Sequence, residues 1–279
     1  MLLQPGETAF TALIKYSASL NPAAFTSADV ASYLRQIEAI AQEEYPRYFH
    51  AAYDDVKARK LGLLAGLNQD LWSELEKLML VYGCDYTILF RELIKVAELA
   101  TTDLTSSSSS SSSSSTPSAN RQRQQQEEEL VQQAYTIIVD SFYEDHQSSR
   151  SAAGVNLDAE DDWCAWIRKY QEAIRLDTER CLEATATSSC DVGGDTCRIL
   201  EVVGRRRAVQ SAANPKYVLR NWMGLLAYER AAKGDYSVVE ELTGLLERPY
   251  DEQDPALSDK WYAKTPDWAR FMPGVTFMS

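Results

Sequence analysis

The sequence lacks several features that would place it in a familiar class of protein. Its 279 residues include only two histidines and five cysteines, and the cysteines form no CxxC repeat. A zinc site normally gathers four clustered ligands and a disulfide framework needs paired cysteines, so neither is expected. No apolar run approaches the roughly 20 residues that span a bilayer, so we expect no membrane partner. One alternative stays open, because Cys190 and Cys197 flank a loop with two glycines that would allow them to pair.

Positive charge is also scarce. The chain has 28 Lys and Arg residues against 41 Asp and Glu residues, a formal net charge of −13. Binding to nucleic-acid phosphates requires a surplus of Lys and Arg on one face, which argues against a general nucleic-acid binder. The triplet Arg205-Arg206-Arg207 is a local basic patch, which we interpret as a solvated helix face.

The sequence contains none of the common catalytic signatures. There is no GxGxxG or Walker loop to hold phosphates, no HExxH zinc pair, no GxSxG elbow, and no kinase-type catalytic loop or DFG. Adjacent acids such as Asp161-Asp162 are interpreted as solvated surface pairs. Trp163 and Trp166 share a helical face with Ile167 and Tyr170, which indicates core packing rather than a stacking platform. No catalytic, cofactor-binding or metal-binding residue is therefore predicted here.

What the sequence does contain is helical periodicity along most of its length. Apolar stripes begin after Ser27, Pro46, Leu71, Asp85, Leu130, Asp161, Cys197 and Gly234, and several end at Gly62, Gly83, Gly234 or Pro249. No stretch alternates with the period of a β-strand. The predicted fold class is all-α, a multi-helix, bundle-like region whose first four helices pack as an antiparallel bundle. The tail after Pro249 shows no clear period.

A polar segment interrupts the helical pattern at residues 101–128. It holds ten consecutive serines, Ser106 to Ser115, followed by a Gln/Glu run, and offers almost nothing apolar to bury. We predict a disordered insert there. Residues 1–100 and 129–279 are then two helical parts of one domain.

The segment Asn214-Pro215-Lys216-Tyr217-Val218-Leu219-Arg220-Asn221 combines a helix-start signal with unusual polarity. Asn favours the N-cap and Pro the first helical position, so we predict that a helix begins at Asn214. Helix packing alone does not explain Lys216, Arg220 and Asn221 among the apolar residues. We expect a structural role, in which Arg220 and Asn221 hydrogen-bond neighbouring helix ends while Lys216 is solvated. In the alternative, Lys216 or Arg220 has a functional role.

Together with other motifs, this segment resembles the C-terminal helical region of the selenoprotein O family, the protein adenylyltransferases with a pseudokinase fold. The motifs occur in the family's order. They are Lys60-Leu61-Gly62-Leu63, Asp85-Tyr86-Thr87 with Phe90-Arg91-Glu92-Leu93, Trp163-x-x-Trp166-x-x-x-Tyr170, Asn214 to Trp222, Gly234-Asp235-Tyr236 and Arg248-Pro249-Tyr250-Asp251. The resemblance covers most of residues 45–272.

The resemblance implies transfer of AMP from ATP to hydroxyl side chains of protein substrates, with Mg²⁺ and a kinase-like fold. In the family, the residues that handle ATP and Mg²⁺ lie in a kinase-like part that precedes this region. None of them is carried over to this chain, which alone is expected to be inactive and to act with that part in cis. In the functional alternative for the Asn214 segment, Lys216 or Arg220 faces that kinase-like part or its nucleotide site. The family's eukaryotic members are mitochondrial, so this compartment is expected, with the cytoplasm as the alternative.

The family usually ends in a Cys or selenocysteine followed by two serines, and this chain stops at Phe277-Met278-Ser279. We expect such a residue within a few codons of Ser279. A second hypothesis for the whole chain is a non-catalytic helical interaction or scaffold module, favoured by the acidic charge and the many amphipathic stripes.

Overall fold

The computed structural model describes residues 19, 26–40, 42, 45–66, 68–107, 117–143, 159–185, 195–270 and 272. This part of the chain is helical and has no β-strand, only an isolated antiparallel bridge between Cys84 and Phe142. The helices are α2 (Ser27–Ala39), α3 (Tyr45–Leu61), α4 (Gln69–Tyr82), α5 (Tyr86–Ser107), α6 (Pro117–Ile138), η2 (Val139–Ser141), α8 (Ala159–Thr185), α9 (Asp195–Ala213), α10 (Asn221–Ala231), α11 (Ser237–Leu246), α12 (Pro255–Trp261) and α13 (Asp267–Arg270). The all-α prediction is confirmed.

The chain divides into two units, Met1–Asp55 and Val56–Ser279. In the first unit, Thr26 rather than Ser27 caps α2, because its hydroxyl oxygen accepts from the Asp29 N–H at 3.2 Å. No described side chain of this unit is buried. The bundle packing predicted for the apolar stripes of α2 and early α3 is therefore wrong within this unit.

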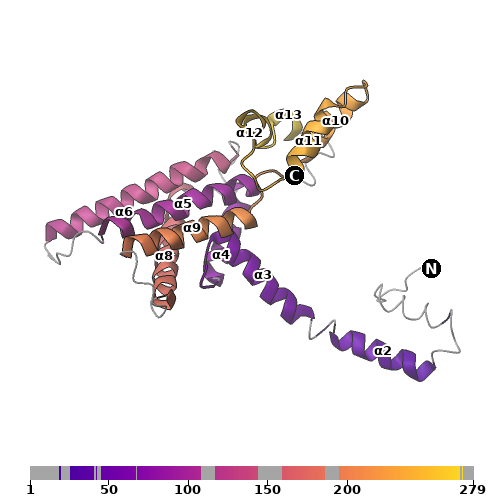
Figure 1. Cartoon of the computed structure of the whole chain (residues 1–279), viewed down its shortest axis with the longest axis horizontal. Coiled ribbons are helices and arrows are strands. Elements are labelled where there is room, and N and C mark those ends of the chain that lie inside the picture. The colour runs from indigo at the N-terminus through magenta and orange to yellow at the C-terminus, as the bar shows by residue number, and fades with distance from the viewer. Residues whose placement is uncertain are drawn as a thin grey trace, which may run out of the picture. The chain divides into compact units, whose positions relative to one another are not determined.

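The second unit is built around α5. Figure 1 shows α5 between α6 and α9, and α8 runs across this layer and contacts all three helices. Positions three and four residues apart on α5 point into the core because they share one helical face. They include Leu89, Leu93, Val96, Ala97 and Ala100, all 2% exposed or less.

The tryptophan helix α8 supplies the other side of this core. Trp163 and Trp166 are fully or almost fully buried, and Trp166 stacks on Tyr170 with 5.1 Å between ring centroids. The indole N–H of Trp166 donates to the Leu71 carbonyl at 3.0 Å. The prediction that the tryptophan pair is core is confirmed.

A second, smaller core joins α10, α11, α12 and α13. Trp222 of α10 stacks on Trp261 of α12 at 5.6 Å. Helix α12 lies in the tail for which no helix was predicted. Its start nevertheless has a clear signal, since the Asp254 carboxylate accepts from the Ala256 N–H and Pro255 is the first helical residue.

The edges of the polar segment 101–128 are helical, contrary to the prediction of disorder across it. Helix α5 continues to Ser107 and α6 begins at Pro117. Arg, Gln and Glu are good helix formers, and α6 gains further stability where Val131 and Ala134 enter the core. Residues 108–116 lie outside the described part. The domain division at residues 100 and 129 stays a prediction.

Candidate functional site

The predicted helix start at Asn214 is wrong, because this residue follows the end of a helix. Helix α9 ends at Ala213, and the Asn214 N–H donates to the Gln210 carbonyl at 2.9 Å, as in a last helical turn. Pro215 cannot continue a helix, since it has no N–H and restricts the residue before it to extended conformations. Residues 214–220 form a non-helical segment, and α10 begins at Asn221. We call residues 214–220 the motif segment.

Asn214 ties the end of α9 to the end of α3. It is 1% exposed, and its amide nitrogen donates to the Lys60 carbonyl at 3.0 Å. In return, the Lys60 ammonium donates to the Asn214 side-chain oxygen at 3.1 Å and to the Ala213 carbonyl at 3.0 Å. Burial lowers the pKa of Lys60, whose ammonium lies 5.3 Å from the ring centre of Phe90. The Lys60 motif and the Asn214 motif thus form one contact.

Arg91 of α5 links the motif segment to the turn after α11. Its guanidinium donates to the Asn214 carbonyl at 3.0 Å and to the Tyr250 carbonyl at 3.4 Å. It also donates to the Glu252 carboxylate at 2.6 Å. The Arg91 side chain is only 6% exposed, so these acceptors replace the water that it loses on folding.

Lys216 is mostly buried rather than solvated, which corrects the expectation from the sequence. Its side chain is 11% exposed, and its ammonium donates to Glu252 at 2.7 Å. The backbone N–H groups of Lys216 and Tyr217 both donate to the Pro249 carbonyl, at 2.7 and 3.1 Å. The motif segment is therefore fixed to the Arg248-Pro249-Tyr250-Asp251 motif by main chain and side chain together.

Arg220 meets the start of α5. It forms a bidentate ion pair with Asp85, with one N–O distance of 2.8 Å, and the two side chains are 10% and 2% exposed. The same carboxylate accepts from the Ile88 N–H at 3.0 Å, as a helix N-cap does, and from the Tyr143 hydroxyl at 3.2 Å. Burial opposes the charged form of Arg220, but the Asp85 carboxylate outweighs it and raises the pKa of Arg220.

The four motif residues named from the sequence therefore do not converge on one open site. Asn214 and Lys216 connect through Arg91 and Glu252, Arg220 pairs with Asp85, and Asn221 is the half-buried first residue of α10. Their partners on α5 all lie at its N-terminal end. This geometry favours the structural interpretation, in which the motif holds helix ends in place.

A second buried ion pair was missed by the sequence reading. Arg206 is 2% exposed and donates to Asp177 at 2.7 Å, to Thr178 at 2.9 Å and to the Gly62 carbonyl at 2.8 Å. The interpretation of residues 205–207 as a solvated face is wrong at this middle position. A signal was present, because Ile199, Val202 and Arg206 follow one another at helical spacing on the buried side of α9.

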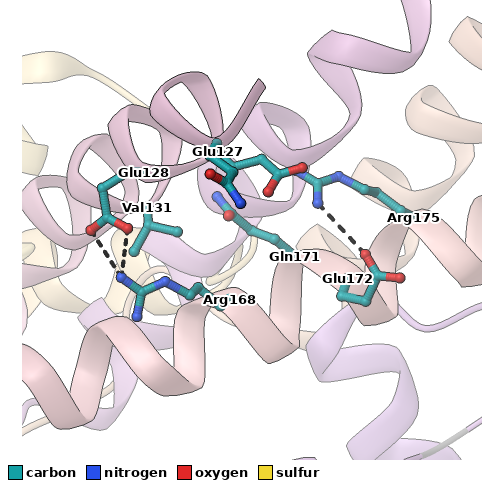
Figure 2. Close-up of a pocket in the computed structure, with 8 residues that line it drawn as sticks. Glu127, Glu128, Val131, Arg168, Gln171, Glu172 and Arg175 are labelled. Carbon is teal, nitrogen blue, oxygen red and sulfur yellow. Dashed lines mark hydrogen bonds and ion pairs between the residues drawn. The ribbon is translucent and has the colours of Figure 1, made fainter. Parts of the chain in front are cut away.

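A pocket of about 340 Å³ lies between α6 and α8 (Figure 2). Its charged walls are paired with each other. Arg168 donates to both carboxylate oxygens of Glu128, at 2.8 and 2.7 Å, and Arg175 lies 3.6 Å from Glu172. Each cation faces an acid, so the pocket presents no concentrated charge of one sign.

The described part of the chain offers no cluster of metal ligands. No group of three or more His, Cys, Asp or Glu residues there could hold a metal ion, and no helix there is long and apolar enough to cross a membrane. Cys84, Cys164 and Cys197 are free thiols. Cys190, the proposed partner of Cys197, lies outside the described residues. The described chain is thus an all-helical module whose motif residues join helix ends through buried charge.

Comparison with known proteins finds homologues of this chain. The chain is 32% identical over 239 residues to the protein nucleotidyltransferase YdiU of Flavobacterium johnsoniae, a match that covers 85% of this chain and 34% of the relative. It is 29% identical over 143 residues to the protein of the same name from Azoarcus sp., covering 51% of this chain and 21% of the relative. A match to the Rhodopirellula baltica protein of this name reaches 45% over 75 residues, 27% of this chain and 14% of the relative. No family model matches the chain.

These matches identify the chain as a homologue of the YdiU protein nucleotidyltransferases, the bacterial selenoprotein O family. The resemblance inferred from the motifs is thereby confirmed. The chain spans about a third of the length of the F. johnsoniae relative.

Proposed function

We propose that the chain is the helical part of a selenoprotein-O-type protein nucleotidyltransferase, which transfers AMP from ATP to hydroxyl groups of proteins. In this proposal a kinase-like part supplies the nucleotide site, and the described helices support it. Homology to proteins named nucleotidyltransferases supports the family. The supporting role of the helices is inferred from the contacts between them.

One observation carries the supporting role: motifs far apart in the sequence meet in a single, largely buried polar network. Lys60, Arg91, Asn214 and Glu252 belong to four separate segments, yet each is hydrogen-bonded to another of the set. Buried polar groups are costly when unpaired, so such a network fixes the positions of the helices that carry it. In this proposal these residues position the helices and do not contact the reacting groups.

The described residues do not fit Mg²⁺ with ATP. Magnesium takes several oxygen ligands with near-octahedral geometry, whereas the buried carboxylates Asp85 and Asp177 are each engaged by an Arg side chain and by backbone N–H groups. Phosphoryl transfer also depends on cations and metal ligands that surround the phosphates. We therefore propose no step of the transfer through this chain and assign those groups to the kinase-like part.

A chimera tests the proposal. The aligned 239 residues of the F. johnsoniae relative are replaced by this chain, and the chimera, the whole relative and this chain alone are incubated with labelled ATP, Mg²⁺ and a protein substrate. We expect label transfer by the relative and by the chimera, and none by the chain alone. Transfer by the chain alone would overturn the assignment of the chemistry to the other part.

A second candidate is a non-catalytic helical interaction module. It is favoured by a row of exposed aromatic side chains on α3, in which Tyr45 stacks on Phe49 at 5.8 Å and Phe49 on Tyr53 at 5.7 Å. Exposed aromatic rows of this kind are typical of protein contact surfaces. If the chain is such a module, the chimera should be folded, as judged by circular dichroism, but should transfer no label. The chimera experiment therefore distinguishes the two candidate functions.

A further inference from the structure

A small pocket beside the motif segment has one more cation than acid among its lining residues, in an otherwise acidic chain. It measures about 140 Å³ and is lined by α5, α9, the motif segment and the residues around α12. Four cations line it, namely Arg91, Lys95, Arg207 and Lys216. Three acids accompany them, so the pocket carries a net positive charge while the chain carries −13.

The two innermost cations share a single carboxylate that is itself exposed. Arg91 and Lys216 have side chains 6% and 11% exposed, and both donate to Glu252, at 2.6 and 2.7 Å. The Glu252 side chain is 74% exposed. Both cations are thus largely removed from water, whereas the carboxylate that they share lies at the surface. Among the described residues, its hydrogen bonds come from these two cations. A buried cation must be neutralised by an anion, but an anion other than the Glu252 carboxylate can do this equally well.

Glu252 can leave without disturbing a helix. It lies in the non-helical stretch between α11 and α12, and the next residue, Gln253, holds the turn through its own side chain. The Gln253 amide donates to the Leu245 and Arg248 carbonyls at 2.8 and 2.7 Å. Rotation of the Glu252 side chain into solvent would therefore leave the backbone of the turn in place.

A third donor in the same pocket has no partner. The Tyr262 hydroxyl is buried and makes no hydrogen bond within the described part of the chain. An unpaired buried hydroxyl is costly, and such groups normally find an acceptor. Burial also raises the pKa of Tyr262, so the hydroxyl keeps its proton and remains a donor at neutral pH.

We propose that this pocket binds the phosphate group of a small-molecule phosphate monoester or of free phosphate, which displaces Glu252. Arg91 and Lys216 bind the phosphate oxygens, and the Tyr262 hydroxyl donates to a third. A phosphate dianion supplies the charge and the acceptor oxygens for two cations and a hydroxyl, whereas Glu252 provides one negative charge. The exposed cations at the rim are each paired with an acid, Lys95 with Glu92 at 2.6 Å and Arg207 with Glu98 at 3.1 Å, so binding depends on Arg91, Lys216 and Tyr262. This binding site is independent of the proposed nucleotidyl transfer.

Calorimetric titration with inorganic phosphate and with glycerol phosphate tests the site in the whole chain. The Glu252→Gln variant removes the internal competitor, and if Glu252 occupies the cations about 90% of the time, phosphate binds about tenfold more tightly in its absence. Lys216→Met is expected to weaken binding at least about tenfold. Glu241→Gln and Lys260→Met are matched controls, because they break an ion pair of 2.8 Å outside the pocket, and they are expected to leave binding unchanged.

The titration results either support or overturn the phosphate-binding proposal. The absence of saturable binding to both the unmodified chain and Glu252→Gln, up to about 10 mM phosphate, would overturn the proposal. Equal tightening in Glu241→Gln would also overturn it, since the effect would then reflect net charge alone. Glu252→Gln retains both buried cations, so the test holds even if Lys216→Met fails to fold. Tighter binding of glycerol phosphate than of inorganic phosphate assigns a monoester, and the reverse order assigns free phosphate.

Discussion

Replacement of Arg220 by Met is expected to destabilise the second unit strongly. The substitution keeps an apolar side chain of similar length but removes the partner of the Asp85 carboxylate, which is 2% exposed. Removing one member of a buried ion pair typically costs about 3–5 kcal/mol, because the remaining charge is left without compensation. Asp85 retains hydrogen bonds from the Ile88 N–H and the Tyr143 hydroxyl, which places the expected cost near the lower end, at about 3 kcal/mol.

A double variant sharpens this prediction. Asn at position 85 can still accept from the Ile88 N–H but carries no charge, so Asp85→Asn combined with Arg220→Met is expected to cost about 2 kcal/mol less than the sum of the two single changes. Lys260→Met is the control, because its ion pair with Glu241 is substantially exposed and such pairs contribute about 0–1 kcal/mol.

Urea unfolding followed by tryptophan fluorescence measures these costs. All six tryptophans lie in the second unit, Val56–Ser279, so the signal reports the part that contains the ion pair. The slope of the free energy against urea must stay constant for the comparison to hold. If Arg220→Met costs no more than Lys260→Met, the claim that the motif holds helix ends together is refuted.

Three further outcomes follow from the same structure. Gly62→Ala should lower the free energy of unfolding in urea by about 1–3 kcal/mol, because φ is +73° there and a Cβ would meet a buried glutamine side chain. The control Gly204→Ala on α9 should be neutral or should raise the free energy of unfolding by about 0.5–1 kcal/mol. Cys197 is exposed, whereas Cys84 is half-buried, and this burial and the neighbouring Asp85 raise the pKa of Cys84 to about 12. Mass-spectrometric mapping at pH 8 should therefore find Cys197 alkylated at least tenfold faster, and equal rates would refute the raised pKa of Cys84. Burial opposes the charged form of Glu252, but Lys216 and Arg91 outweigh burial and lower the pKa of Glu252. The carboxylate therefore contributes stability above about pH 4.5, and this contribution is lost as the pH falls through the folded-state pKa. Glu252→Gln should flatten the acid side of the stability profile.

Local signals in the sequence predicted helix ends well where the chemistry is local. Gly83 ends α4 in a left-handed conformation and Asp85 caps α5, as expected from their types. The same rules failed at Asn214-Pro215, because this pair is compatible with a helix start and with a helix stop. The preceding helix decides between them, since Pro215 ended a helix whose last turn already included Asn214.

Long-range partners could not be predicted from the sequence. Nothing near Arg206 or Lys216 reveals that Asp177 and Glu252 neutralise them, 29 and 36 residues away along the chain. Charged residues are exposed in most proteins, so residue type alone places both in solvent. The helical spacing of Arg206 with Ile199 and Val202 indicates a buried position but does not identify its partner. The motif order identified the family, but only the fold shows that those motifs meet in one network.

The most direct measurement compares stability and AMP transfer in the chimera with and without Arg220→Met. The account predicts that the variant loses about 3 kcal/mol of unfolding free energy while the transfer rate per folded molecule stays within about twofold. Unchanged stability with a transfer rate at least about tenfold lower would contradict it, because Arg220 would then act in the reaction rather than in the fold.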